Sequence, residues 1–92
     1  RRAEPAARLD LAAIARRRFA ADARMRATKS SLDAGKYQLD VALRSGDEKE
    51  MTERREGTDE LTARWITEQR EVQELDTERA AKLDPIEALR YE

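Results

Sequence analysis

The sequence predicts an all-α protein: an antiparallel two-helix coiled-coil hairpin followed by a short C-terminal helix. Three observations predict this fold. Ala, Arg, Glu and Leu are the commonest of the 92 residues, and charged residues reach 42%, which is typical of long helices and coiled coils. Apolar residues recur at spacings of three and four. The two halves also differ in charge. The half before Gly46 is basic, with 11 Lys and Arg against 5 Asp and Glu, and the half after it is acidic, with 8 against 15. Opposite charge favours packing of the two halves as antiparallel helices.

The first arm of the hairpin is expected to run from about Pro5 to Leu43. Pro5 suits the first turn of a helix, because the N–H that proline lacks would be unsatisfied there in any case. Large residues recur at intervals of seven positions, with Arg18 as the exception in the series: Leu11, Met25, Leu32 and Leu39. A second row three positions further on is smaller: Ile14, Ala21, Thr28, Gly35 and Ala42. Together the two rows predict a heptad seam with a close helix–helix approach.

A turn near 45–47 is expected to reverse the chain. Gly46 can take the left-handed conformation that ends a helix, and Asp47 followed by Glu50 resembles a capping box that starts the next one. The second arm then shows apolar residues at alternating spacings of three and four: Met51, Leu61, Trp65, Val72 and Leu75. Polar residues interrupt this second seam and are expected to weaken it: Arg54, Thr58 and Glu68.

Further boundaries are indicated inside and after the two arms. The stretches Ser30-Ser31-Leu32-Asp33 and Gly57-Thr58-Asp59-Glu60 resemble internal N-caps, so breaks near 30 and 57 are compatible with the hairpin of residues 1–83. Residues 84–92 are expected to form a separate helix, with Asp84 as its N-cap and Pro85 in its first turn. Its apolar side would consist of Ile86, Leu89 and Tyr91.

The last thirteen residues, AAKLDPIEALRYE, carry a family resemblance. They resemble the cytosolic C-terminal tail of MacB/FtsX-type ABC-transporter permeases. In those permeases membrane-spanning helices precede the tail, whereas the stretch WITEQREVQELDTER that precedes it here is too polar to enter a bilayer. Two interpretations follow: either a capped helix of favourable local chemistry has recurred by chance, or a tail of that type stands on a different, soluble chain. In neither case does the resemblance carry a transport function with it.

Several kinds of chemistry are disfavoured by the composition. The chain has no Cys and no His, which removes thiolate nucleophiles, imidazole bases and the commonest transition-metal ligands. The acidic stretches lack the alternating oxygen ligands of a calcium loop. We therefore expect no enzyme activity, no cofactor and no metal site. The redox compartment is undetermined without cysteine, and a cytoplasmic location is favoured although no motif fixes it.

An arginine cluster in the first arm offers an alternative function. Dense positive charge could neutralise nucleic-acid phosphates, through Arg16, Arg17, Arg18, Arg24 and Arg26. These residues spread around a helical wheel, and Phe19 is the sole aromatic residue among them, so no platform for base stacking exists. A helix whose arginines are solvated and pair with the acidic arm is the favoured interpretation.

The function predicted is a non-catalytic structural or assembly subunit that acts through helix–helix contacts in a larger complex. Only 15 of 92 residues are Leu, Ile, Val or Phe, so a solitary hairpin would be marginal, and we expect a protein partner or self-association. No stretch approaches the ~20 apolar residues of a membrane span. A third hypothesis is a disordered adaptor that folds on binding. The interface is expected at Leu11, Ile14, Met25, Leu32, Leu39, Leu61, Trp65, Val72 and Leu75.

Overall fold

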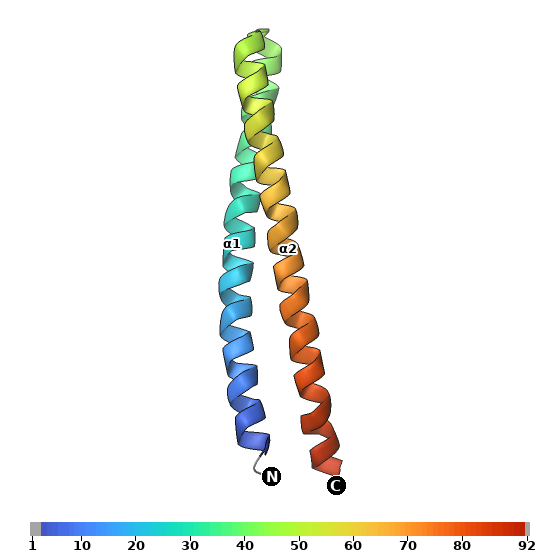
Figure 1. Ribbon diagram of the computed structural model, residues 1–92. Helices are drawn as coiled ribbons and strands as arrows, with labels where there is room; N and C mark the ends of the chain where they lie inside the picture. The colour runs from blue at the N-terminus through green and yellow to red at the C-terminus, as the bar shows by residue number, and fades with distance from the viewer. Residues whose placement is uncertain (1–2, 92) are drawn as a thin grey trace.

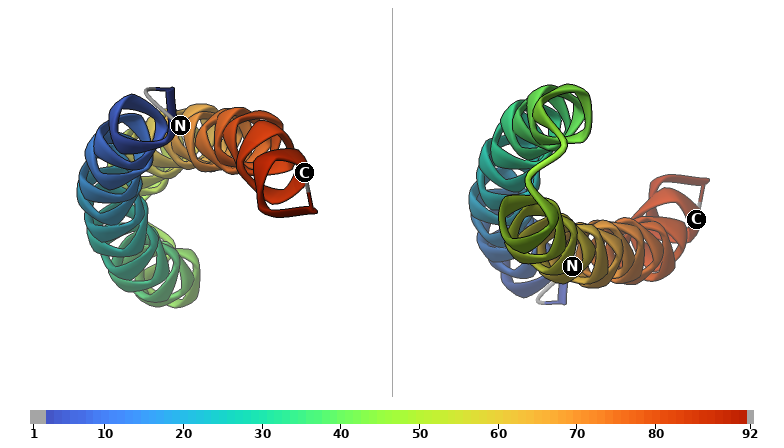
Figure 2. Two further views of the ribbon diagram at one scale, coloured as in Figure 1. Left: turned by 90° about the horizontal axis from the view of Figure 1, so that it is seen from below. Right: turned by 90° about the horizontal axis from the view of Figure 1, so that it is seen from above.

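The computed structural model describes the backbone of residues 3–91 and the side chains of residues 8–83. The described backbone forms two long helices, α1 (Ala3–Ser45) and α2 (Glu48–Tyr91), which pack side by side in opposite directions (Figure 1). The molecule is a rod of 68 × 15 × 14 Å. Both helices follow a curved path when viewed along the rod (Figure 2), as expected where a seven-residue repeat keeps one seam in contact. The prediction of an all-helical hairpin is confirmed.

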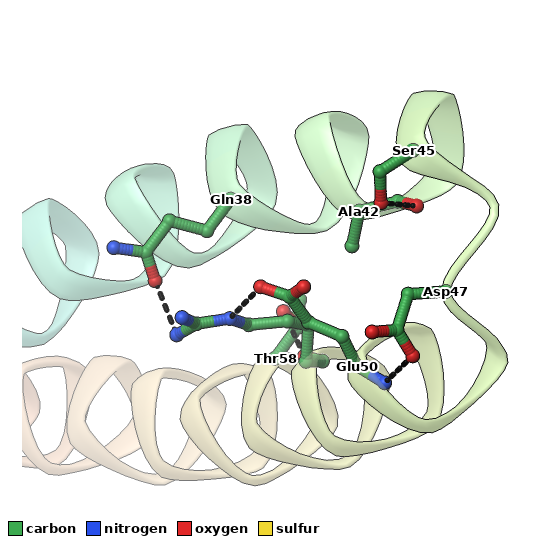
Figure 3. A network of polar contacts seen from close by, with 7 residues as sticks. Gln38, Ala42, Ser45, Asp47, Glu50 and Thr58 are labelled. Carbon is green, nitrogen blue, oxygen red and sulfur yellow. Dashed lines mark hydrogen bonds and ion pairs between the residues drawn. The ribbon is translucent and has the colours of Figure 1, made fainter.

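The reversal takes place at Gly46 and Asp47. Gly46 has a φ of 74°, and its N–H donates to the carbonyl of Ala42 at 3.1 Å, which is the hydrogen bond of a left-handed C-cap. Asp47 starts α2, because its Oδ1 accepts a 3.1 Å hydrogen bond from the N–H of Glu50 (Figure 3). The Glu50 side chain reaches towards Arg54 instead of back towards Asp47. Two local caps therefore end one helix and begin the next within two residues.

Gly46→Ala is expected to lower the free energy of unfolding by about 1–2 kcal/mol, because an alanine at positive φ brings its Cβ too close to the following carbonyl oxygen. Gly57→Ala provides the matched control. Gly57 lies inside α2 with nothing within 4 Å of an added Cβ, so this change should raise stability by up to ~1 kcal/mol. Urea titration followed by circular dichroism at 222 nm measures both. Equal effects of the two substitutions would contradict the turn geometry.

The core of the hairpin is a single narrow seam. Buried residues of α1 come mainly from the row of smaller residues: Ile14, Ala21, Thr28 and Ala42. From the row of large residues, only Leu32 is fully buried, while Leu11, Met25 and Leu39 stay partly exposed. The small side chains lie in the closest part of the interface, because they let the two backbones approach, and the larger ones stand at its edge.

Both helices are continuous where the sequence indicates boundaries. α1 passes through residues 30–31 and α2 passes through Gly57 without interruption. The seam keeps its phase on both sides of each site, so tertiary packing outweighs the local capping signals. α2 also includes Asp84 and Pro85 and ends at Tyr91, which differs from the separate C-terminal helix predicted there. Proline removes one hydrogen bond of the ladder, and the helix continues past it. The expected apolar side at Ile86, Leu89 and Tyr91 lies outside the described side chains.

Candidate protein-interaction surface

The nine apolar residues predicted to form the interface divide into two groups in the structure. Four are buried between α1 and α2: Ile14, Leu32, Val72 and Leu75. Five are only partly covered by the opposite helix: Leu11, Met25, Leu39, Leu61 and Trp65. The first group holds the hairpin together, and the second group is accessible to contacts outside it.

A polar pair occupies one layer of the seam. Thr28 is 7% exposed, and its Oγ1 donates a 2.6 Å hydrogen bond to Oε1 of Glu68 on the opposite helix. Sliding either helix along the other would leave the buried hydroxyl without this partner, so the pair favours one register. Sequence reasoning saw Glu68 only as an interruption of the seam. The missed signal was a second polar residue, Thr28, in the facing row.

Thr28→Val is expected to lower the free energy of unfolding by about 0.5–1.5 kcal/mol, because valine keeps the shape but removes the donor to Glu68. Thr67→Val is the matched control. The Thr67 hydroxyl is exposed and bonds only the carbonyl of Ala63 in its own helix, so its loss should change stability by no more than ~0.5 kcal/mol. Urea titration of the two variants measures the difference. A loss for Thr67→Val as large as that for Thr28→Val would refute a special role of the seam pair.

One side of the hairpin carries several of the ion pairs that join the helices, while a further one, Arg18–Asp76, lies on the other side. Arg24 lies 2.8 Å from Glu71, and Arg17 lies 3.4 Å from Glu78. Their side chains are largely exposed, so these pairs contribute little to stability and chiefly favour the correct pairing of the arms. We call this side the paired face; it comprises Arg17, Arg24 and Gln38 of α1 with Arg54, Glu71 and Glu78 of α2.

Two more arginines of the predicted nucleic-acid set also contact carboxylates. Arg18 donates a 2.7 Å hydrogen bond to Asp76, and this bond, with the attraction of the Asp76 charge, raises the pKa of the Arg18 guanidinium. Arg26 pairs with Asp22 in its own helix at 2.8 Å. Arg16 is exposed, and within the described residues it has no ion pair. Four of the five arginines are therefore engaged with carboxylates of the chain itself.

The opposite side of the hairpin carries apolar side chains that the fold leaves half-covered. On α1 the paired-face residues lie three positions after members of the buried row, whereas Leu11, Met25 and Leu39 lie three positions before them. In a heptad repeat these offsets flank the seam on opposite sides. We call this second side the open face; the Arg18–Asp76 ion pair lies on it, and its apolar members are Leu11, Met25, Leu39 and Leu43 of α1 with Met51, Trp65 and Ile66 of α2.

The indole of Trp65 is the largest apolar group of the open face. Lys29 Nζ lies 5.1 Å from the centroid of the ring, within the range of a cation–π contact. The same ammonium group lies 2.9 Å from Asp33, so its charge is balanced within α1. The seam covers the indole only in part, and a residue of this type that is partly exposed is a common anchor of protein interfaces.

Two shallow grooves lie on the side of the paired face. One of about 310 Å³ is floored by small residues, including Ala34, Gly35 and Gly57. A Cβ added at Gly35 would meet Thr58 Oγ1 at 3.5 Å, an ordinary contact. The distance between the two helices therefore does not require a glycine at this position. A second groove of about 340 Å³ lies beside Arg24 and Arg64. Both are open to solvent and lined by charged groups at their edges.

The part of the chain that the structure describes contains no group of three or more metal-binding side chains. Within the same residues, neither helix has a segment that is both long and apolar enough to cross a bilayer. The chain matches no protein-family model, no curated protein and no solved structure. The resemblance of the last thirteen residues to permease tails therefore stays a prediction.

Proposed function

We propose that this protein is a non-catalytic assembly subunit that binds another protein through helix–helix contacts at its open face. The observation that carries the proposal is the partial burial of Met25, Leu39 and Trp65, which the hairpin holds in place but covers only in part. Apolar groups that are rigidly presented and half-exposed gain further burial when a partner helix covers them. Long paired helices also present such groups in a regular row, which suits recognition by another helix.

Two features of the site support binding in preference to catalysis. The grooves are open to solvent, whereas acid–base or nucleophilic catalysis uses positioned groups in a site from which water can be excluded. Three of the charged residues that line them already have partners within the hairpin: Arg24, Arg54 and Glu68. Binding of nucleic acid to α1 receives less support, because most of its clustered arginines would first have to leave a carboxylate.

Site-specific photo-crosslinking in the cells that make the protein tests this function. A benzoylphenylalanine placed at Ile66, which is 43% exposed on the open face, is expected to form adducts with protein. The same probe at Glu60 is the control, because this exposed position of α2 lies about 120° away around the helix axis. Protein adducts from position 66 alone support the proposal. Adducts with nucleic acid, or equal adducts from both positions, would refute it.

The hypothesis of an adaptor that folds only on binding makes a different prediction. An assembly subunit with a preformed surface should show high helicity as an isolated chain at low micromolar concentration. Circular dichroism of the purified protein measures this directly. A spectrum typical of an unfolded chain, changing to a helical one only with a partner, would replace the preformed surface with coupled folding and binding.

A further inference from the structure

We infer that the partner of the open face is a second copy of this chain, which stacks on it to form a four-helix bundle with a two-fold axis parallel to the rod. This inference rests on the proposed function and names its partner. Three properties of the described residues lead to it: the area that the hairpin leaves exposed, the distribution of charge between the two helices, and the register of their pairing.

The exposed area exceeds what a folded monomer of this size usually retains. The chain of 10.6 kDa has an accessible surface of 7158 Å², whereas a compact monomer of that mass exposes about 5,500 Å². The excess of about 1,700 Å² is more than the ~800 Å² that each partner contributes to a standard interface. A second hairpin on the open face would lower the accessible surface area of each chain towards the value for a compact monomer, and it would cover Met25, Leu39 and Trp65 together.

The charge of the two helices selects the orientation of the second copy. With the two-fold axis parallel to the rod, each basic α1 lies on the acidic α2 of the other copy, and all neighbouring helices are antiparallel. With the axis perpendicular to the rod, α1 would lie on α1 and α2 on α2, so helices of like charge would face each other. Like-charge contacts disfavour the second arrangement. Neighbouring helices are antiparallel in both arrangements, so the charge of the side chains, and not the helix dipoles, selects the orientation.

The register within one hairpin predicts which charges would meet between copies. Residues that face each other across the seam have numbers that add to between 92 and 96, as Asp10 with Lys82 and Thr28 with Glu68 show. A two-fold rotation about an axis parallel to the rod leaves every residue at the same position along the rod. Lys36 then lies at the height of Asp59 of the other copy, and neither residue has an ion pair among the described residues of the hairpin.

A matched pair of substitutions tests whether the open face forms the dimer. Leu43 and Val41 are 49% and 46% exposed, but their side chains point about 160° apart around α1, and only Leu43 belongs to the open face. Sedimentation of the full chain from micromolar to sub-millimolar concentration should give twice the chain mass for the unmodified protein and for Val41→Glu. Leu43→Glu should give the mass of a single chain and stay helical. Ile66→Glu repeats the test on α2, should Leu43→Glu fail to fold.

The orientation is tested by one spin label per chain at Glu48→Cys, next to the turn. A two-fold axis parallel to the rod brings the two turns to the same end, so a short distance between labels is expected. A perpendicular axis would separate them by roughly the 68 Å length of the rod and would overturn the charge-based orientation. A single-chain mass at every concentration, or equal loss of the dimer in Val41→Glu, would overturn self-association. Crosslinks from position 66 to a different protein would in that case still support the assembly role.

Discussion

Leu32→Ala is expected to lower the free energy of unfolding by about 2–4 kcal/mol, the range for removing a leucine from a close-packed site. Leu32 is 1% exposed and is one of the two largest fully buried side chains of the seam. Among the described residues each helix has only the other helix as a neighbour, so no second layer lies behind this seam to fill the resulting cavity. Since small domains have only ~5–15 kcal/mol of stability in total, the variant should lose much of its helical signal at 37 °C.

Leu9→Ala is the matched control for this prediction. It makes the same chemical change in the same helix, but Leu9 is 73% exposed, so the free energy of unfolding should change by less than ~0.5 kcal/mol. Urea titrations at a fixed chain concentration give both values, because the stability of any associated form depends on concentration. A loss for Leu9→Ala comparable to that for Leu32→Ala would show that a different surface of α1 is buried.

Ala21→Leu is expected to lower the free energy of unfolding by about 1–3 kcal/mol, the usual cost of forcing extra methyl groups into a packed core. Ala21 is completely buried beside Val72 and Leu75. A leucine there would push the two helix axes apart beside Val72 and Leu75. The helix propensities of alanine and leucine are nearly equal, so the effect reports the contact between helices.

The exposed neighbour Ala23 provides the control for this overpacking experiment. Ala23→Leu places the same side chain two residues further along α1, on the side away from the seam, and stability should stay within ~0.5 kcal/mol of the unmodified protein. Thermal unfolding at equal concentrations compares the two variants. If Ala21→Leu were as stable as Ala23→Leu, the row of small residues would not be the closest part of the interface.

Local patterns in the sequence were sufficient to predict the hairpin. Gly46 and Asp47 have local roles, as a left-handed C-cap and an N-cap, and neither role depends on distant residues. The heptad rows and the opposite charges of the two arms likewise indicate which sides meet. These features predicted the turn and the antiparallel pairing. The possible breaks near 30 and 57 do not occur, because a cap signal is worth only ~1 kcal/mol, less than the packing of a seam that continues in phase on both sides.

The details of the surface depended on register, which the sequence did not reveal. Thr28 and Glu68 each look like a defect when one arm is considered alone, and they become a hydrogen-bonded pair only at one alignment of the two arms. The same alignment decides that Ala21 is buried while Met25 stands at the edge of the seam. Sequence reasoning therefore named the correct seam, but it could not separate the residues that close the hairpin from those that remain open to a partner.

The most direct test of the account is the distance between spin labels at Arg16→Cys and Thr77→Cys, with labelled chains diluted in unlabelled protein so that only distances within one chain are measured. Both positions are exposed and lie at the same height in the hairpin. We predict a short distance, set by helix axes roughly 8–10 Å apart and by the length of the two labels. A distance near ~90 Å, the rise of 61 helical residues in one straight rod, would contradict the hairpin and every surface assigned to it.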